Sequence, residues 1–177
     1  MRTIIVCVLA LAGLTGCAPS ADVRPVVEAA TDRLLLADGV AAGKRTSGAP
    51  VEDLPREAAV LDAADSRARE LGLDPALART VVGDQIRASK VVQTGLLREW
   101  GSGVPAPPDR ADVATLRKSL DQVTDGLLVA LDRSAGALSG PDCRAAVEES
   151  RREITRERSL DALHADALGV AVGSLCR

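Results

Sequence analysis

The sequence predicts an all-α protein, a six-helix bundle that forms one domain. The composition is 46% hydrophobic but contains no Phe or Tyr, and Trp100 is the only aromatic residue. The core must therefore consist of Leu, Val and Ala, and Leu and Ala favour helix over strand. Stretches with helical periodicity alternate with short breaks rich in Gly and Pro, and no stretch has the pattern of a strand of any length. A length of 177 residues fits a single domain.

The first three helices are predicted from their start and stop signals. The first covers residues 22–44, with Pro25 tolerated in its first turn, and the segment 46–50 ends it. The second covers residues 51–71 and stops at Gly72. Asp74 then provides an N-cap and Pro75 the first position of a long third helix, residues 75–100.

Three further helices complete the predicted bundle. A proline-rich connection, residues 104–108, precedes a fourth helix over residues 109–135. Gly140 and Pro141 break the chain again. The last two helices are shorter, and we expect them over residues 142–158 and 159–175.

The N-terminus has the pattern of a signal peptide rather than of a folded segment. Arg2 precedes an apolar run, residues 4–14, which is too short to span a membrane permanently. The sequence Leu14-Thr15-Gly16-Cys17 resembles a bacterial lipoprotein signal, so residues 1–16 would be removed and Cys17 would carry lipid, the only expected membrane attachment. The alternative is an ordinary secretory signal cleaved after Ser20 or Ala21. The lipoprotein interpretation gives a mature domain of residues 17–177, and both interpretations place the mature protein outside the cytosol.

The remaining cysteines agree with export. Cys7 lies in the removed peptide and Cys17 carries the lipid, which leaves Cys143 and Cys176 as a pair. In an oxidising compartment we expect these two to form a disulfide. His164 is the only histidine, so no metal site is expected, and His164 itself is expected to be an ordinary surface or core residue. The net charge of −3 does not suggest a nucleic-acid partner.

Several charged residues fall on faces that should be apolar. Arg33 and Lys44 are eleven residues apart, about three turns, so on one continuous helix they share a face with small apolar residues. Asp53, Arg56, Glu57 and Val60 follow the spacing i, i+3, i+4, i+7 on the second helix. By itself this second set fits a surface salt-bridge cluster as well as a binding site.

Uncharged polar residues interrupt the apolar stripe of the third helix. They are Gln85, Ser89 and Gln93, and each needs a hydrogen-bond partner if buried. They would form either an interhelical network or part of a ligand site. On the fourth helix Arg117 and Lys118 are adjacent, and periodicity does not choose between them. Cations and neutral donors pointing inward from separate helices suit a small molecule with several negative charges.

These positions resemble the active-site pattern of the all-helical chorismate mutases, and the resemblance covers nearly the whole mature chain. The ordered set is Arg33, Lys44, Asp53, Arg56, Glu57, Ser89 and Gln93. The run Asp84-Gln85-Ile86-Arg87-Ala88-Ser89 is similar to the third-helix signature of the exported branch, as are Val51-Glu52-Asp53 and the late cysteine pair.

The resemblance implies an intramolecular rearrangement of chorismate to prephenate, a step of the shikimate pathway towards aromatic amino acids, with no metal or cofactor. Chorismate carries two carboxylates, a hydroxyl and an ether oxygen. The implied catalytic residues are Lys44, Gln93 and Arg56: Arg56 would bind carboxylate, Lys44 would meet a carboxylate and the ether oxygen, and Gln93 would donate to the ether oxygen.

The resemblance also implies roles for the other residues of the site. Arg33 and Ser89 would bind carboxylate, Asp53 and Glu57 would face the hydroxyl, and Val60 would line the pocket. In the exported branch an arginine of the fourth helix replaces one lent by a partner chain; Arg117 is the first candidate and Lys118 the second. Helical mutases are commonly dimers, so a homodimer is one implied assembly. The competing interpretation is a non-catalytic helical surface lipoprotein that binds a partner or an anionic ligand.

Two positions depart from part of the family: Val60, where a polar residue can occur, and Gln93. Some members have Glu where this chain has Gln93. A carboxyl group must be protonated to donate a hydrogen bond, whereas an amide donates at any ordinary pH. We therefore expect a rate that is nearly flat across neutral pH.

Overall fold

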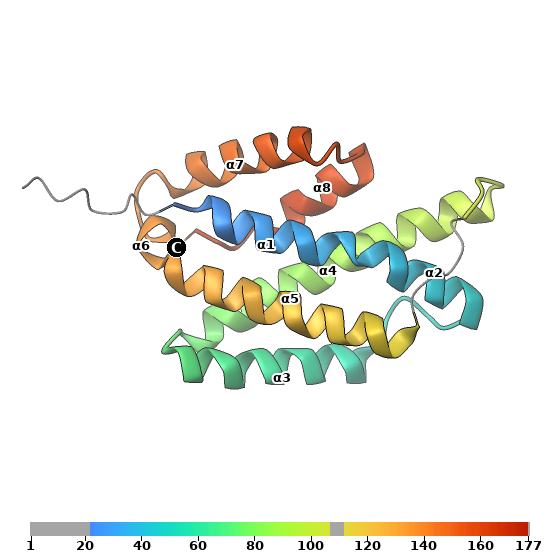
Figure 1. Ribbon diagram of the computed structural model, residues 1–177, viewed down its shortest axis with the longest axis horizontal. Coiled ribbons are helices and arrows are strands. Elements are labelled where there is room, and N and C mark those ends of the chain that lie inside the picture. Colours follow the sequence, from blue (N-terminus) through green and yellow to red (C-terminus); the bar gives the residue numbers. More distant parts are fainter. Residues whose placement is uncertain (1–21, 107–111, 177) are drawn as a thin grey trace, which may run out of the picture.

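The computed structural model describes residues 22–106 and 112–176, and these residues form helices and turns without any strand (Figure 1). The predicted all-α class is therefore confirmed for this part of the chain. The predicted signal peptide and the lipid-bearing Cys17 lie outside the described residues. The helices are α1 (Arg24–Leu35), α2 (Ala37–Ser47), α3 (Leu54–Leu71), α4 (Pro75–Gly101), α5 (Val113–Arg133), α6 (Ala135–Leu138), α7 (Cys143–Glu157) and α8 (Ala162–Ala171).

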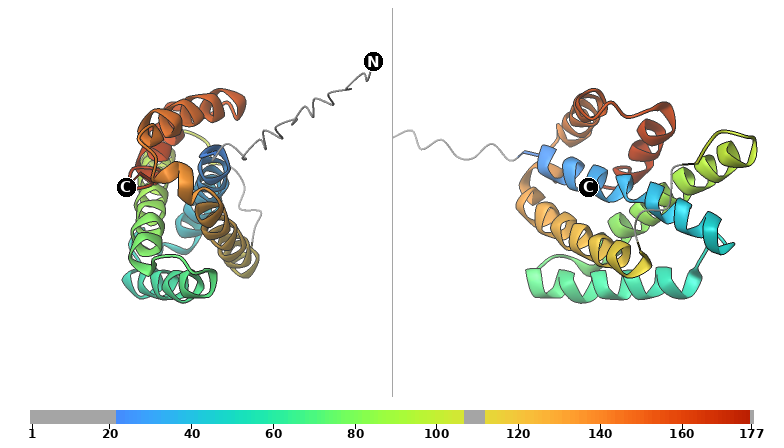
Figure 2. Two further views of the ribbon diagram at one scale, coloured as in Figure 1. Left: turned by 90° about the vertical axis from the view of Figure 1, so that its left-hand side faces the viewer. Right: turned by 45° about the vertical axis from the view of Figure 1, so that its right-hand side comes forward.

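The long helix α4 is the central element of the bundle. Its 27 residues extend over about 40 Å at 1.5 Å per residue. It packs against α8, α3, α2 and α1, with α3 along its N-terminal part and α2 at its C-terminal end (Figures 1 and 2). Asp74 accepts a hydrogen bond from the backbone N–H of Ala76 at 2.9 Å, and Pro75 occupies the first turn, so the predicted start of this helix is confirmed.

The prediction of a single first helix over residues 22–44 is wrong. A turn at Leu36 divides it into α1 and α2, because the Leu36 N–H donates to the carbonyl of Arg33, three residues back, at 3.3 Å. This tighter bond interrupts the α-helical ladder. Helix α2 then continues to Ser47 and ends at Gly48, whose φ of 71° is accessible to glycine. Arg33 and Lys44 consequently belong to two helices rather than to one face of one helix.

The predicted count of six helices is also corrected, to eight helical segments in the described residues. Helix α5 ends at Arg133 rather than at residue 135, and the short helix α6 follows it. Helix α3 begins at Leu54 rather than 51, because the Asp53 carboxylate caps it by accepting the Arg56 N–H at 3.1 Å. Helices α7 and α8 are shorter than predicted; Ser159, with a φ of 51°, and the N-cap Asp161 separate them.

The core is aliphatic, as the composition requires. Leu34 of α1, Leu127, Leu128 and Leu131 of α5, and Leu168 of α8 are almost completely buried in one cluster. Trp100 lies apart from this cluster, against Ala41 and Ala42 of α2. Burial of apolar area contributes roughly 25 cal/mol per Å², so these interhelical contacts are the main stabilising term of the bundle.

Two further contacts fix the C-terminal helices. Cys143 at the start of α7 and Cys176 after α8 form a disulfide with a Cα–Cα distance of 5.8 Å, which confirms the predicted pairing. The buried Gln85 amide of α4 donates to the Ala171 carbonyl of α8 at 2.8 Å, so this residue belongs to an interhelical contact.

Within the described ranges no helix is both long and apolar enough to cross a membrane.

Candidate active site

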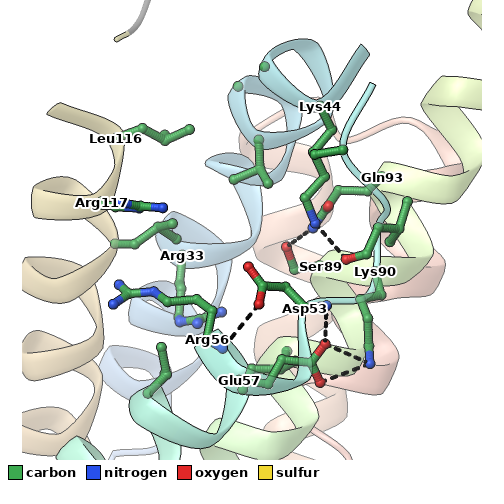
Figure 3. Close-up of a pocket in the computed structure, with 18 of the residues that line it drawn as sticks. Arg33, Lys44, Asp53, Arg56, Glu57, Ser89, Lys90, Gln93, Leu116 and Arg117 are labelled. Atoms are coloured by element: carbon green, nitrogen blue, oxygen red, sulfur yellow. Dashed lines mark hydrogen bonds and ion pairs between the residues drawn. The ribbon is translucent and has the colours of Figure 1, made fainter. Parts of the chain in front are cut away.

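A cavity of about 360 Å³ lies between α1, α2, α3, α4 and α5. Its size is within the range of small-molecule sites. All nine residues that the sequence assigned to a substrate site line this cavity, although they come from five helices and the loop before α3 (Figure 3). They are Arg33, Lys44, Asp53, Arg56, Glu57, Val60, Ser89, Gln93 and Arg117.

Arg33 is the most deeply buried cation of the cavity, with 5% of its surface exposed. Its Nε donates to the Thr124 hydroxyl of α5 at 3.0 Å, which leaves the two terminal nitrogens of the guanidinium for another partner. Burial lowers the pKa of Arg33 to about 10, opposed by the nearby carboxylate of Asp121. The side chain therefore remains a cation at neutral pH and presents a charge inside the bundle.

Lys44 enters the cavity from α2. Its Nζ donates to the Val51 carbonyl in the loop before α3 at 2.5 Å, so this contact fixes the ammonium at the cavity wall (Figure 3). Burial lowers the pKa of Lys44, and the carboxylates of Asp53 and Glu57 oppose that shift. An ammonium has three N–H donors, so two remain for a ligand.

Glu57 of α3 is paired with Lys90 of α4. The Lys90 ammonium donates to both carboxylate oxygens, at 2.9 and 3.1 Å, and both side chains are mostly buried. The hydrogen bond to Glu57 raises the pKa of Lys90 above its ordinary value. The pair fixes the Glu57 carboxylate at the cavity wall.

Ser89 and Gln93 are one turn apart on α4 and interact directly. The Gln93 Nε2 donates to the Ser89 hydroxyl oxygen at 2.9 Å, while the Gln93 Oε1 is buried without a partner in the described residues. Rotation of the amide by 180° would let the Ser89 hydroxyl donate to Oε1 and would free the NH₂ group. The Gln93 amide thus has hydrogen-bonding capacity left over beside the cavity, which a ligand could use.

Helix α5 closes the side of the cavity opposite Lys44 and Gln93 (Figure 3). Arg117 lines the cavity there, whereas its neighbour Lys118 lines a shallow depression on the surface. On the same side the Arg56 guanidinium donates to the Asp121 carboxylate at 3.1 Å. The geometry thus favours Arg117 over Lys118 as the cation that α5 contributes.

Four polar residues that line the cavity were not found from the sequence: Ser47, Lys90, Asp121 and Thr124. Arg117, Asp121 and Thr124 follow the spacing i, i+4, i+7 on α5, so a polar stripe beginning at Arg117 could have revealed the last two. Lys90 gives no comparable signal, because its partner Glu57 is 33 residues away in the sequence.

The charges around the cavity sum to a positive value. Five cations line it and three carboxylates accompany them, a net charge of +2: Arg33, Lys44, Arg56, Lys90 and Arg117, against Asp53, Glu57 and Asp121. This balance suits a dianion. Across residues 22–106 and 112–176 there is no group of three or more His, Cys, Asp or Glu that could hold a metal ion.

The chain is similar to proteins named chorismate mutase. The family model described as chorismate mutase type II matches residues 24–94, which contain eight of the nine assigned site residues. The secreted chorismate mutase of Mycobacterium tuberculosis is 32% identical over 159 residues, with coverage of 89% of this chain and 80% of the relative. The protein of the same name from Mycolicibacterium smegmatis is 30% identical over 154 residues, with coverage of 86% and 85%.

A solved structure agrees with these relatives. The crystal structure of chorismate mutase from Burkholderia thailandensis superimposes with a TM-score of 0.83 and 37% sequence identity, covering 87% of this chain and 98% of that one. The relatives therefore match the helical bundle as a whole, and not the first helices alone. The chain belongs to the chorismate mutase family.

Proposed function

We propose that this protein is a chorismate mutase that rearranges chorismate to prephenate inside the cavity between α1 and α5. The observation that carries the proposal is the convergence of all nine assigned residues on one cavity with a net charge of +2. Chorismate is a dianion with two carboxylates, so its charge is complementary to that of the cavity.

The arginines bind the two carboxylates and hold the substrate in a reactive conformer. Arg33 retains free guanidinium nitrogens beside its bond to Thr124, and Arg56 and Arg117 reach the same cavity. Ser89 adds a hydroxyl donor to a carboxylate. An intramolecular rearrangement requires no nucleophile or general base, so enforced proximity of the bond-forming carbons supplies part of the rate enhancement.

Lys44 and Gln93 stabilise the negative charge that develops on the ether oxygen as the C–O bond breaks. Both lie on the same side of the cavity (Figure 3). A rate enhancement of about 10⁶ requires roughly 8 kcal/mol of barrier reduction. One preorganised donor to a developing oxyanion contributes roughly 3–4 kcal/mol, so these two groups supply most of that amount. Asp53 and Glu57 face the hydroxyl, and Val60 lines the wall.

The same proposal includes the location of the protein. Residues 1–16 act as a lipoprotein-type signal, Cys17 carries the lipid, and residues 17–177 form the exported enzyme. The relatives named secreted chorismate mutase and the Cys143–Cys176 disulfide support export. The cavity described here is built from one chain, which supports a complete pocket in each protomer, including in a homodimer.

Loss of the chorismate absorbance tests the activity directly. Purified mature protein should consume chorismate at a rate proportional to enzyme concentration, and nuclear magnetic resonance should identify prephenate as the product. Absorbance that stays flat over hours, with a sample that is folded by circular dichroism, would favour the non-catalytic binding protein.

A further inference from the structure

The carboxylate of Asp121 lies among the cations that the proposed function assigns to the substrate. It accepts a hydrogen bond from Arg56 Nη2 at 3.1 Å and lines the cavity together with Arg33 and Arg117. The negative charge of Asp121 also favours the charged form of the buried Arg33 guanidinium, since it raises the pKa of that group against the effect of burial. A substrate carboxylate that takes the hydrogen bond of Arg56 Nη2 therefore has to replace the carboxylate of Asp121.

The Arg56–Asp121 pair is built so that it can separate. The Asp121 side chain is 67% exposed and that of Arg56 is 40% exposed. Ion pairs at such exposure contribute little to stability, because water solvates the separated charges well. By contrast, the other acidic cavity residue with a basic partner, Glu57, holds Lys90 in a mostly buried contact with two hydrogen bonds. The α5 side is thus the exchangeable side of the cavity.

We propose that Asp121 is a resident counter-anion: its carboxylate holds Arg56 in the free enzyme, and a carboxylate of the bound dianion replaces it. Asp121 then remains close to the bound molecule and repels it. This inference rests on the proposed function, because it takes substrate and product to be dicarboxylates. Its consequence is that Asp121 weakens the binding of substrate and product alike, which keeps the product exchangeable, without taking part in bond breaking.

The chain offers a matched control one turn along the same helix. Asp125 accepts a hydrogen bond from Arg67 of α3 at 2.6 Å and is 52% exposed, so it makes the same kind of α5–α3 ion pair. Neither Asp125 nor Arg67 lines the 360 Å³ cavity. Asp125→Asn therefore removes the same charge and the same type of interhelical contact as Asp121→Asn, but away from the substrate.

Steady-state kinetics of the two variants and the wild type provide the first test. At low ionic strength Asp121→Asn should lower KM for chorismate about fivefold while kcat stays within about twofold, the signature of a change in uniform binding. The difference should shrink in 0.5 M salt, since screening at that ionic strength, with a Debye length of about 4 Å, weakens the repulsion. Asp125→Asn should match the wild type. A KM for Asp121→Asn that equals or exceeds that of Asp125→Asn would overturn the inference and would instead indicate that Asp121 only positions Arg56.

Calorimetric titration with prephenate provides a test that does not depend on turnover. Asp121→Asn should bind prephenate about fivefold more tightly than the wild type or Asp125→Asn. If this tightening occurs in a protein that does not consume chorismate, the proposed function fails while the role of Asp121 stands. Equal, weaker or absent prephenate binding by Asp121→Asn overturns the role of Asp121, whatever the activity of the wild type.

Discussion

The imidazole of His164 in α8 lies 2.9 Å from the carboxylate of Asp38 in α2. The other ring nitrogen lies 2.8 Å from the Asp161 carboxylate that caps α8. A protonated imidazole donates through both nitrogens, so it can satisfy both carboxylates at once. The contact joins the last helix of the bundle to the helix that carries Lys44.

Stability should fall at alkaline pH because of this contact. The hydrogen bond to Asp38 raises the pKa of His164 from 6.5 to about 9 against the effect of burial. The stabilisation is therefore fully present below pH 6.5 and is lost as the pH rises through about 9. Since both carboxylates are partly exposed, we expect about 2 kcal/mol. Urea unfolding of the wild type and of His164→Gln should show a gap between them at pH 6 that closes at pH 10; a gap of constant size would contradict this assignment.

Thr124 should matter for substrate binding through Arg33. Thr124→Val keeps the shape of the side chain but removes the acceptor of the Arg33 Nε hydrogen bond. An unpaired buried donor costs about 1–3 kcal/mol, which is enough to let the guanidinium move out of position. We expect KM for chorismate to rise about fivefold or more while the circular dichroism spectrum is unchanged. Thr124→Ser, which restores the hydroxyl, should recover most of the affinity; if both variants behave alike, the hydroxyl is not the relevant group.

Gln93 should make the rate nearly independent of pH between about 6 and 8, because its amide donates in every protonation state available there. Gln93→Glu should shift activity towards acid, since only the protonated carboxyl donates to the ether oxygen. The measurement is kcat/KM of both proteins across that range. Equal activity of the two at pH 8 would count against the proposed role of Gln93.

The disulfide should stabilise the bundle without affecting the cavity. It closes a segment with a sequence separation of 33 residues that contains α7 and α8, and neither cysteine lines the cavity. Loop-closure entropy gives about 3–4 kcal/mol for a segment of this length. Replacing both Cys143 and Cys176 by Ala should lower Tm by roughly 10 °C, since about 1 kcal/mol corresponds to 2–4 °C at this size. Activity at 25 °C should be retained in the folded fraction; loss of activity without loss of stability would show a link to the cavity.

The helical class and the polar stripe of α4 could be predicted from local pattern in the sequence, whereas the assignment of most cavity residues rested on the resemblance to the all-helical chorismate mutases. The Asp74-Pro75 start of α4 follows from capping chemistry, which involves only neighbouring residues. Ser89 and Gln93 were identified as polar positions in an apolar stripe, and both line the cavity. Gln85 has the same pattern, but its amide donates a hydrogen bond to α8 and does not reach the cavity. Periodicity could not separate the two cases, since it shows which face of a helix is buried and not what covers that face.

The parts that could not be predicted depend on contacts between distant segments. No Gly or Pro in the sequence marks the turn at Leu36. The direction of α2 is instead set by its contacts with α4 and α5 and by the contact of Asp38 with His164 of α8. Lys90 pairs with Glu57, and Asp121 pairs with Arg56. Each pair joins two helices, so the spacing of residues within one helix does not reveal it. The choice between Arg117 and Lys118 depends on which face of α5 meets the cavity. Two adjacent residues in a sequence do not determine that orientation.

The most direct test of the account compares chorismate turnover by Lys44→Ala, Lys118→Ala and the wild type. Lys44 lies in the cavity with its ammonium fixed by Val51, whereas Lys118 is close by on α5 but outside the cavity. Lys44→Ala should lower kcat/KM by at least about 100-fold, the loss expected for one donor to a developing oxyanion, while circular dichroism shows a folded chain. Lys118→Ala should match the wild type. More than a tenth of wild-type activity in Lys44→Ala would contradict electrostatic catalysis within this cavity.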